Sequence, residues 1–167
     1  RGERAKYFGE DYTDRDFGWK AYGLVKSAEE NFRNLAPNIQ NMLIGYSAGY
    51  YATGSYNTFV GESAGKGGTT SAPYSSGESN TAVGFAALDA FTTGDANVAV
   101  GPNALNSLNT GYRNIAIGDR AGNSITSGAS GVYIGYLAGY GGNQSGNVAI
   151  GAEALFTANS NSNVAVG

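Results

Sequence analysis

A short pattern of hydrophobic and polar positions recurs along most of the chain. From residue 41 onward, Asn or Gly is followed by three mostly apolar residues and a glycine, as in Asn97-Val-Ala-Val-Gly101. Eight copies are present, and their closing glycines are separated by 16, 23, 17, 17, 17, 16 and 16 residues. An apolar stretch bounded by turn residues predicts a short strand. A fixed period of this kind predicts a repeat architecture.

The residue before each closing glycine is always Ile or Val, and we assign these side chains to the interior of a stack of coils. The predicted core consists of Ile44, Val60, Val83, Val100, Ile117, Ile134, Ile150 and Val166. β-branched side chains suit a pleated, half-buried surface. One unit cannot bury its own apolar residues, so successive units must stack. On this interpretation, Ile117→Asp would place an unpaired charge inside the stack and disrupt it.

The remaining positions of the unit complete the prediction of a solenoid. The closing glycines are expected to supply positive φ at corners; they are Gly45, Gly61, Gly84, Gly101, Gly118, Gly135 and Gly151. The central alanine of many copies, such as Ala99 or Ala116, faces away from the β-branched pair and suggests close approach of another backbone. Stacked asparagines could form a hydrogen-bonded ladder. The predicted fold is therefore all-β, a parallel β-solenoid with 16 or 17 residues and two short strands per coil.

The first forty residues differ in composition from the rest. Fourteen of the 23 charged residues lie before Asn41. This shift predicts two parts: an N-terminal cap or connector over 1–40 and an eight-repeat fibre segment over 41–167. The sequence Ser27-Ala-Glu-Glu30 matches a capping box and predicts a short helix over 28–36. The first part is expected to cover the open edge of the first coil or to join a preceding domain; a partner-docking peptide is the alternative.

Composition removes several classes of function. The chain has no cysteine, which excludes disulfides and thiolate metal sites, and no histidine, the commonest general base and metal ligand. The pI near 4.8 argues against a nucleic-acid partner. Glycoside hydrolysis needs two carboxylates at a defined separation, and the six acids of the repeat region form no recurring pair. We therefore predict a protein that is not an enzyme, with no cofactor and no catalytic or metal site. No apolar run is long enough to span a membrane.

Two features suggest contact with a receptor. The 23-residue interval contains an insertion within 66–77, and insertions in solenoids map to loops that often bind partners. Tyrosines flank the Ala-Gly corners of two repeats, where their rings could stack on sugars or pack against a neighbouring chain. These pairs are Tyr46 with Tyr50, and Tyr136 with Tyr140. The candidate receptor contacts are Lys66, Thr69, Tyr74, Tyr136 and Tyr140.

The run Asn97-VAVGPNALNSLNTGYRNIAIGDRAG122 is similar to the Asn-x-Ala-Ile-Gly-x-x-Ala-Leu repeats of YadA-like trimeric adhesin heads. It resembles still more closely the repeat arrays of phage tail fibres and related surface fibres. The resemblance covers 41–167. It implies a left-handed β-roll, three chains side by side, and a role as shaft or head of an attachment fibre on a virion or a bacterial surface. It also implies neighbouring fibre or baseplate segments and a cell-surface glycan or protein receptor as partners. An intertwined triple β-helix is the rival fold.

Two other functions fit a solenoid. A self-assembling extracellular filament subunit is the main alternative. An ice-binding solenoid would need a regular array of threonines, but Thr58 and Thr81 share a position that later holds Val and Ile. The chain begins at Arg1 and stops at Gly167, at the end of a motif, so we interpret it as a segment of a longer fibre.

Overall fold

The computed structural model describes residues 40–68, 75–157 and 160–167. The chain divides into two units, Arg1–Ile39 and Gln40–Gly167. The helix predicted over 28–36, and the cap to which it was assigned, lie outside the described residues. The following description concerns the second unit.

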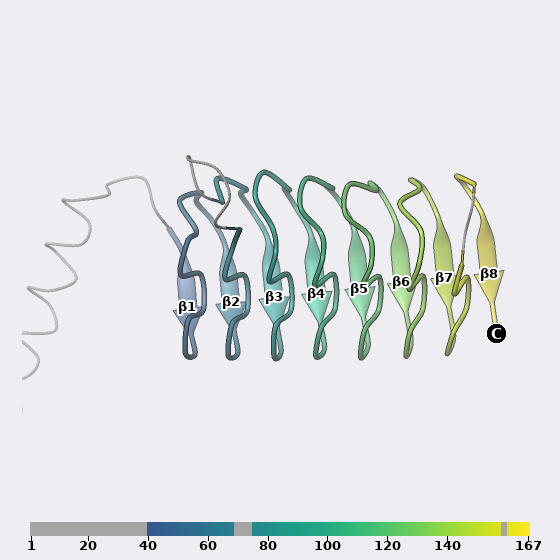
Figure 1. Ribbon diagram of the computed structural model, residues 1–167, viewed down its shortest axis with the longest axis horizontal. Helices are drawn as coiled ribbons and strands as arrows, with labels where there is room; N and C mark the ends of the chain where they lie inside the picture. The colour runs from purple at the N-terminus through teal and green to yellow at the C-terminus, as the bar shows by residue number, and fades with distance from the viewer. Residues whose placement is uncertain (1–39, 69–74, 158–159) are drawn as a thin grey trace, which may run out of the picture. The chain divides into compact units, whose positions relative to one another are not determined.

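Eight strands of three residues each form one parallel sheet. They are β1 (Met42–Ile44), β2 (Thr58–Val60), β3 (Thr81–Val83), β4 (Val98–Val100), β5 (Ile115–Ile117), β6 (Val132–Ile134), β7 (Val148–Ile150) and β8 (Val164–Val166). The strands follow chain order in the sheet, and equivalent residues pair, as Val98 does with Ile115. Each strand begins one coil, and the coils stack in a row (Figure 1). The predicted parallel β-solenoid is confirmed. Each coil takes the number of its strand below.

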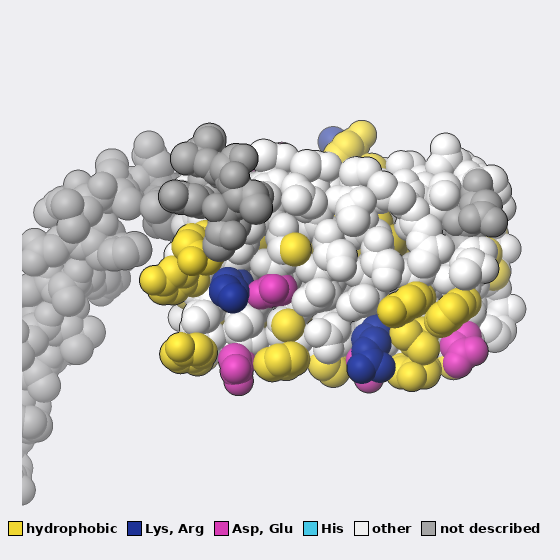
Figure 2. Space-filling model, viewed as in Figure 1, with side chains coloured by type: hydrophobic (Ala, Val, Ile, Leu, Met, Phe, Trp, Pro, Cys, Tyr) yellow, Lys and Arg dark blue, Asp and Glu magenta, His cyan; other side chains and the backbone are white. Residues whose placement is uncertain are grey.

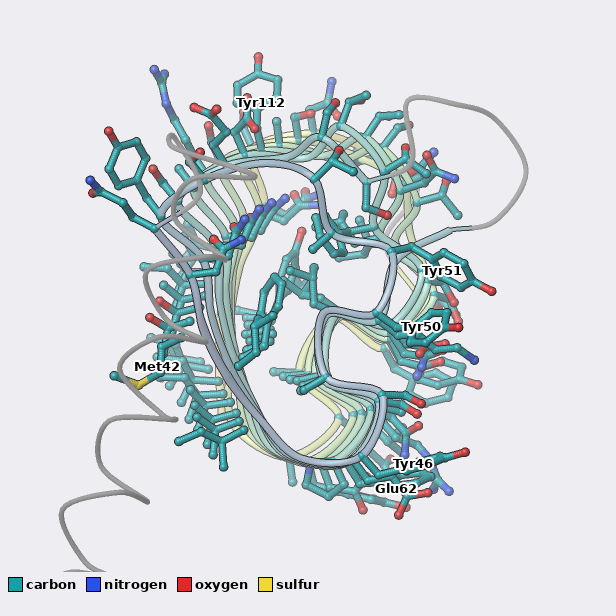
Figure 3. All side chains as sticks on the ribbon, turned by 90° about the vertical axis from the view of Figure 1, so that its left-hand side faces the viewer. Met42, Tyr46, Tyr50, Tyr51, Glu62 and Tyr112 are labelled. Carbon is teal, nitrogen blue, oxygen red and sulfur yellow. The ribbon has the colours of Figure 1, made fainter. Side chains whose placement is uncertain are left out.

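The direction of winding can be followed in Figure 3, which views the stack from the β1 end. The chain passes from Met42 on one side, along the bottom to Tyr46, and up the other side through Tyr50 and Tyr51. This path is counter-clockwise while the later coils recede from the viewer. The solenoid is therefore left-handed.

Each coil contains one strand, and the prediction of two strands per coil is wrong. The reason is the number of residues with positive φ, which bend the chain. Coil 4 has four of them: Gly101 (124°), Asn103 (55°), Leu105 (48°) and Arg113 (57°). Sixteen non-glycine residues among those described have positive φ, a conformation that costs an L-residue about 1–2 kcal/mol. Backbone hydrogen bonds between coils continue through these turns, as from Leu105 N to Ala121 O at 3.0 Å, and hold them in place.

The closing glycines stand where coils approach most closely. Their φ lies between 124° and 136°, in agreement with the prediction of positive φ. A Cβ added to Gly118 would lie 2.5 Å from the carbonyl oxygen of Gly135 in the next coil. The same steric conflict recurs at Gly45, Gly61, Gly84, Gly101, Gly135 and Gly151. Stacking at this spacing therefore requires glycine at the corner.

The side chains predicted as the core do not lie inside the coil. Ile44, Val60, Val83, Val100, Ile117, Ile134, Ile150 and Val166 all lie on the outer side of the sheet, half-buried or exposed. Alternation along a strand sends neighbouring side chains to opposite faces. The inward side chain is the central one, buried as Phe59, Tyr133 or an alanine such as Ala99. The predicted stacking in register is right, and the predicted face is wrong.

Three positions fill the interior of each coil, and their sizes compensate. They are the central strand residue and the fourth and seventh residues after the closing glycine. Coil 4 combines Ala99 with Leu105 and Leu108, whereas coil 2 combines Phe59 with two glycines. A Cβ added to Gly65 would lie 2.5 Å from the Phe59 ring. A large side chain on the strand thus excludes one from the opposite turn.

The opening asparagines form the predicted ladder. In coil 4, the Asn97 side chain donates from Nδ2 to Asn80 Oδ1 at 3.0 Å and to Gly111 O at 2.9 Å. Its Oδ1 accepts from the backbone N–H of Asn114 at 3.0 Å. Asn57, Asn80, Asn97, Asn114 and Asn147 are nearly or fully buried. Each satisfied amide thus ties its own turn to the neighbouring coil.

The ladder is interrupted at coil 6. Gly131 occupies the asparagine position there, and the hydroxyl of Tyr133 fills the space, because a Cβ on Gly131 would lie 2.2 Å from it. The Tyr133 hydroxyl is buried and has no hydrogen-bond partner among the described residues. The ring therefore replaces the volume of the missing asparagine and not its hydrogen bonds.

Replacing Asn97 by alanine should lower the free energy of unfolding by about 2–3 kcal/mol, because three hydrogen bonds in a buried site are lost. Thermal or urea unfolding followed by circular dichroism measures this. Asn106→Ala is the matched control, since half-buried Asn106 makes a single side-chain bond, to Ala86 O at 3.1 Å. It should cost less than about 1 kcal/mol. Equal losses from the two variants would contradict the ladder's role.

Candidate functional site

The outer side of the sheet is the most extensive chemically uniform surface of the described chain. It consists of the first and third residues of every strand, and we call it the outer face. Fourteen of its sixteen side chains are Met, Ile or Val, and the other two are Thr58 and Thr81. None of the sixteen is buried. In Figure 3 these side chains project as a comb on the side of Met42, away from the interior.

The outer face carries no charge. All nine charged residues after position 40 lie in the turns, outside β1 to β8. Seven strand spacings of about 4.8 Å and strands three residues long give the face a footprint of about 34 by 10 Å. Uncovered apolar patches of this size on soluble proteins mark interaction sites. The β1 and β8 ends are the most exposed, with Ile44 57% and Val166 74% accessible.

The two threonines of the outer face are neighbours. Thr58 pairs with Thr81 across β2 and β3, and both are half-buried. Within the described part of the chain, neither hydroxyl has a hydrogen-bond partner. The positions that flank this pair in the same column are Met42 and Val98. A single polar spot thus lies near one end of an apolar face.

Lys66, predicted as a receptor contact, lies beside Asp89 of the next coil. Both side chains are half-buried. Desolvation by burial raises the pKa of the Asp89 carboxyl above its ordinary value, and the charge of Lys66 opposes this rise. One oxygen of Asp89 is buried without a hydrogen-bond partner among the described residues. The predicted contacts Thr69 and Tyr74 lie outside the described residues.

The tyrosines at the corners differ in accessibility. Tyr46 and Tyr50 of coil 1 are 80% and 68% exposed. Tyr136 is 45% exposed, whereas Tyr140 is half-buried and stacks on Phe156, with ring centroids 5.1 Å apart. The coil 1 pair therefore offers more open ring surface than the pair named as receptor contacts.

The predicted receptor contacts do not form one site. Lys66 lies in coil 2, and Tyr136 and Tyr140 lie in coil 6, four coils or about 19 Å away along the stack. Figure 2 shows a side of the solenoid on which hydrophobic and charged side chains gather along the lower edge and most other groups are neither. These turn residues lie on other sides of the coil than the outer face, as the labelled Tyr46 and Tyr50 show in Figure 3.

The described residues show no grouping that points to a catalytic or metal centre. No three carboxylates come together in the part of the chain that the structure describes. Burial raises the pKa of the Tyr133 hydroxyl, which lies in the apolar interior. Within the same residues, no helix has the length and apolarity to cross a membrane.

The chain was compared with protein-family models, with curated proteins and with solved structures, and no match was found. The outer face is the site that sequence reasoning missed, because its side chains were assigned to the interior. One signal could have found it: the central strand residue is large wherever the fourth residue after the closing glycine is glycine and no large side chain follows three residues later. Such compensation is expected between side chains that share one enclosed space.

Proposed function

We propose that the chain is a non-enzymatic segment of an attachment fibre, in which three copies pack side by side through their outer faces. The observation that carries the proposal is the outer face itself, an uncharged apolar surface along the whole described stack. Its size and composition favour coverage by protein, because leaving it in water is unfavourable. The number three and the location, on a phage tail fibre or a bacterial surface, rest on the resemblance of the repeats.

The proposed role is mechanical. Stacked coils with a continuous ladder make a stiff rod, and lateral packing of three rods would add the apolar burial that a thin coil lacks. Such a rod would hold a receptor-binding tip away from the particle or cell, joined to neighbouring fibre or baseplate segments. The exposed rings of Tyr46, Tyr50 and Tyr136 would remain accessible to a glycan or protein receptor, since they lie off the outer face.

The mass of the full chain in solution tests this proposal. Light scattering after size-exclusion chromatography should give three times the 17.1 kDa of one chain. A mass of one chain over the working range of concentrations would contradict it. Electron microscopy separates it from the main alternative, because a self-assembling filament subunit would give open-ended filaments in place of discrete short particles.

Ile117→Asp should dissociate the assembly while each chain stays folded. Ile117 is 41% exposed on the outer face, so the charge would meet water in the single chain and an apolar partner in the assembly. The expected result is an unchanged circular dichroism spectrum with a fall in mass to one chain. This revises the expectation that the substitution disrupts stacking.

Ser124→Asp is the matched control for Ile117→Asp. It adds the same charge to coil 5 at an exposed turn position off the outer face, and the mass should not change. An Ile117→Asp protein that keeps the wild-type mass would exclude the outer face as the interface.

A further inference from the structure

The Thr58–Thr81 pair interrupts an otherwise apolar face. Threonine and valine have the same shape, and valine occupies the equivalent position in four of the other six strands. The hydroxyls therefore add nothing to the packing of the coil, and neither bonds within the described chain. Their position on a face that a partner would cover points to a role in the contact with that partner.

A further copy of this chain is the partner that the outer face fits. Each copy repeats along the axis at the same spacing, about 4.8 Å, so two outer faces can interdigitate over their whole length. A partner without this spacing would lose register after a few coils. The face has no charge that would repel a second copy. Its apolar composition matches the core of homo-oligomeric interfaces.

We propose that Thr58 and Thr81 set the orientation and axial register of the assembled copies. This inference rests on the proposed function, because it requires copies that pack through their outer faces. When the copies run parallel and in register, threonine hydroxyls from different chains meet at the levels of β2 and β3. A hydroxyl both donates and accepts, so such hydroxyls can satisfy one another in a dry interface.

Other arrangements leave the hydroxyls without partners. If two copies ran antiparallel with their ends aligned, β2 would face β7 and β3 would face β6. Thr58 would then lie opposite Val148, and Thr81 opposite Val132. A parallel shift by one coil keeps one Thr–Thr level, and a shift by two coils keeps none. Unpaired buried hydroxyls are costly, so the in-register parallel arrangement is selected. A lone asparagine in a coiled coil acts in the same way.

Distances between spin labels on the full chain test this inference. The chain has no cysteine, so Ala152→Cys, at an exposed turn of coil 7, provides one label per copy. With Thr58 and Thr81 present, pulsed electron resonance should give one narrow distance distribution. With Thr58→Val and Thr81→Val added, the assembly should persist and further distances should appear. In the antiparallel arrangement the labels separate by about 24 Å along the axis, or five coils.

Moving the pair provides the matched control. Val132 and Val148 are paired neighbours on β6 and β7. Adding Val132→Thr and Val148→Thr to the double valine variant should restore the single distance. The proposal is overturned if the double valine variant keeps one narrow distance or dissociates, or if the moved pair restores nothing. In each of these cases the assembly of the unsubstituted chain still stands, whereas a labelled chain that stays monomeric overturns both proposals.

Discussion

Gly118→Ala should unfold the middle of the solenoid, with a loss of at least about 4 kcal/mol in the free energy of unfolding. The new Cβ would lie 2.5 Å from the carbonyl oxygen of Gly135 and 2.7 Å from its carbonyl carbon. These are backbone atoms, and Gly135 N donates to Ile117 O at 2.8 Å, so the next coil cannot move away without losing this bond. The φ of 135° strains an alanine further. Thermal or urea unfolding at fixed protein concentration measures the loss.

Gly141→Ala is the matched control for Gly118→Ala. The nearest atoms to its new Cβ would be Phe156 O at 3.3 Å and a Thr157 methyl carbon at 3.9 Å. Small adjustments accommodate this, so the change should stay within about 1 kcal/mol. Similar losses at Gly118 and Gly141 would show that the corner contact does not limit the spacing of the coils.

Exchanging the large and small interior positions of coil 6 should show strong coupling. Tyr133→Ala alone should cost about 3–5 kcal/mol, because it empties the centre of a buried coil. Gly139→Leu alone should be at least as harmful, since a Cβ there would lie 2.0 Å from the Tyr133 ring. Together they recreate the Ala99 and Leu105 combination of coil 4. The double variant should therefore be more stable than either single variant.

The backbone of coil 6 can accept this exchange. Gly139 has a φ of 61°, and leucines at the equivalent position of coils 3, 4 and 7 have φ of 55°, 48° and 49°. A double-mutant cycle of unfolding free energies should give a favourable coupling of at least about 2 kcal/mol. Additive losses would contradict the shared interior volume.

Tyr133→Phe separates the ring from its hydroxyl. It keeps the volume and removes only a buried polar atom that has no hydrogen-bond partner among the described residues. Stability should be unchanged or slightly higher, because an unsatisfied buried hydroxyl is unfavourable. A loss near that of Tyr133→Ala would show that the hydroxyl is bonded in solution.

The sequence was sufficient to predict the stack, because its decisive interactions repeat at one period. The opening asparagine needs the same residue in the neighbouring coil to complete its bonds, and the closing glycine needs the same corner above it. Both requirements leave the same residue type at a constant interval. Asn97 and Gly118 are examples, and the parallel register follows from aligning such positions.

Sequence reasoning failed on the inside and outside of the coil, because both faces of each strand are apolar. Alternation places Val98 and Val100 on one face and Ala99 on the other, and hydrophobicity alone favours the larger pair as core. The interior is narrow, so alanine suffices where Leu105 and Leu108 cross from the opposite turn. The candidate site was missed for the same reason, since the residues that form it had been assigned to the core.

The in-register stacking of coils has a consequence for evolution. Each coil carries its own interior side chains and bonds to the coil on either side through equivalent atoms. A duplication or deletion of one repeat in the gene would therefore add or remove about 4.8 Å of length and leave the other coils in place. Recombination between repeats can thus change the reach of the molecule without a new fold.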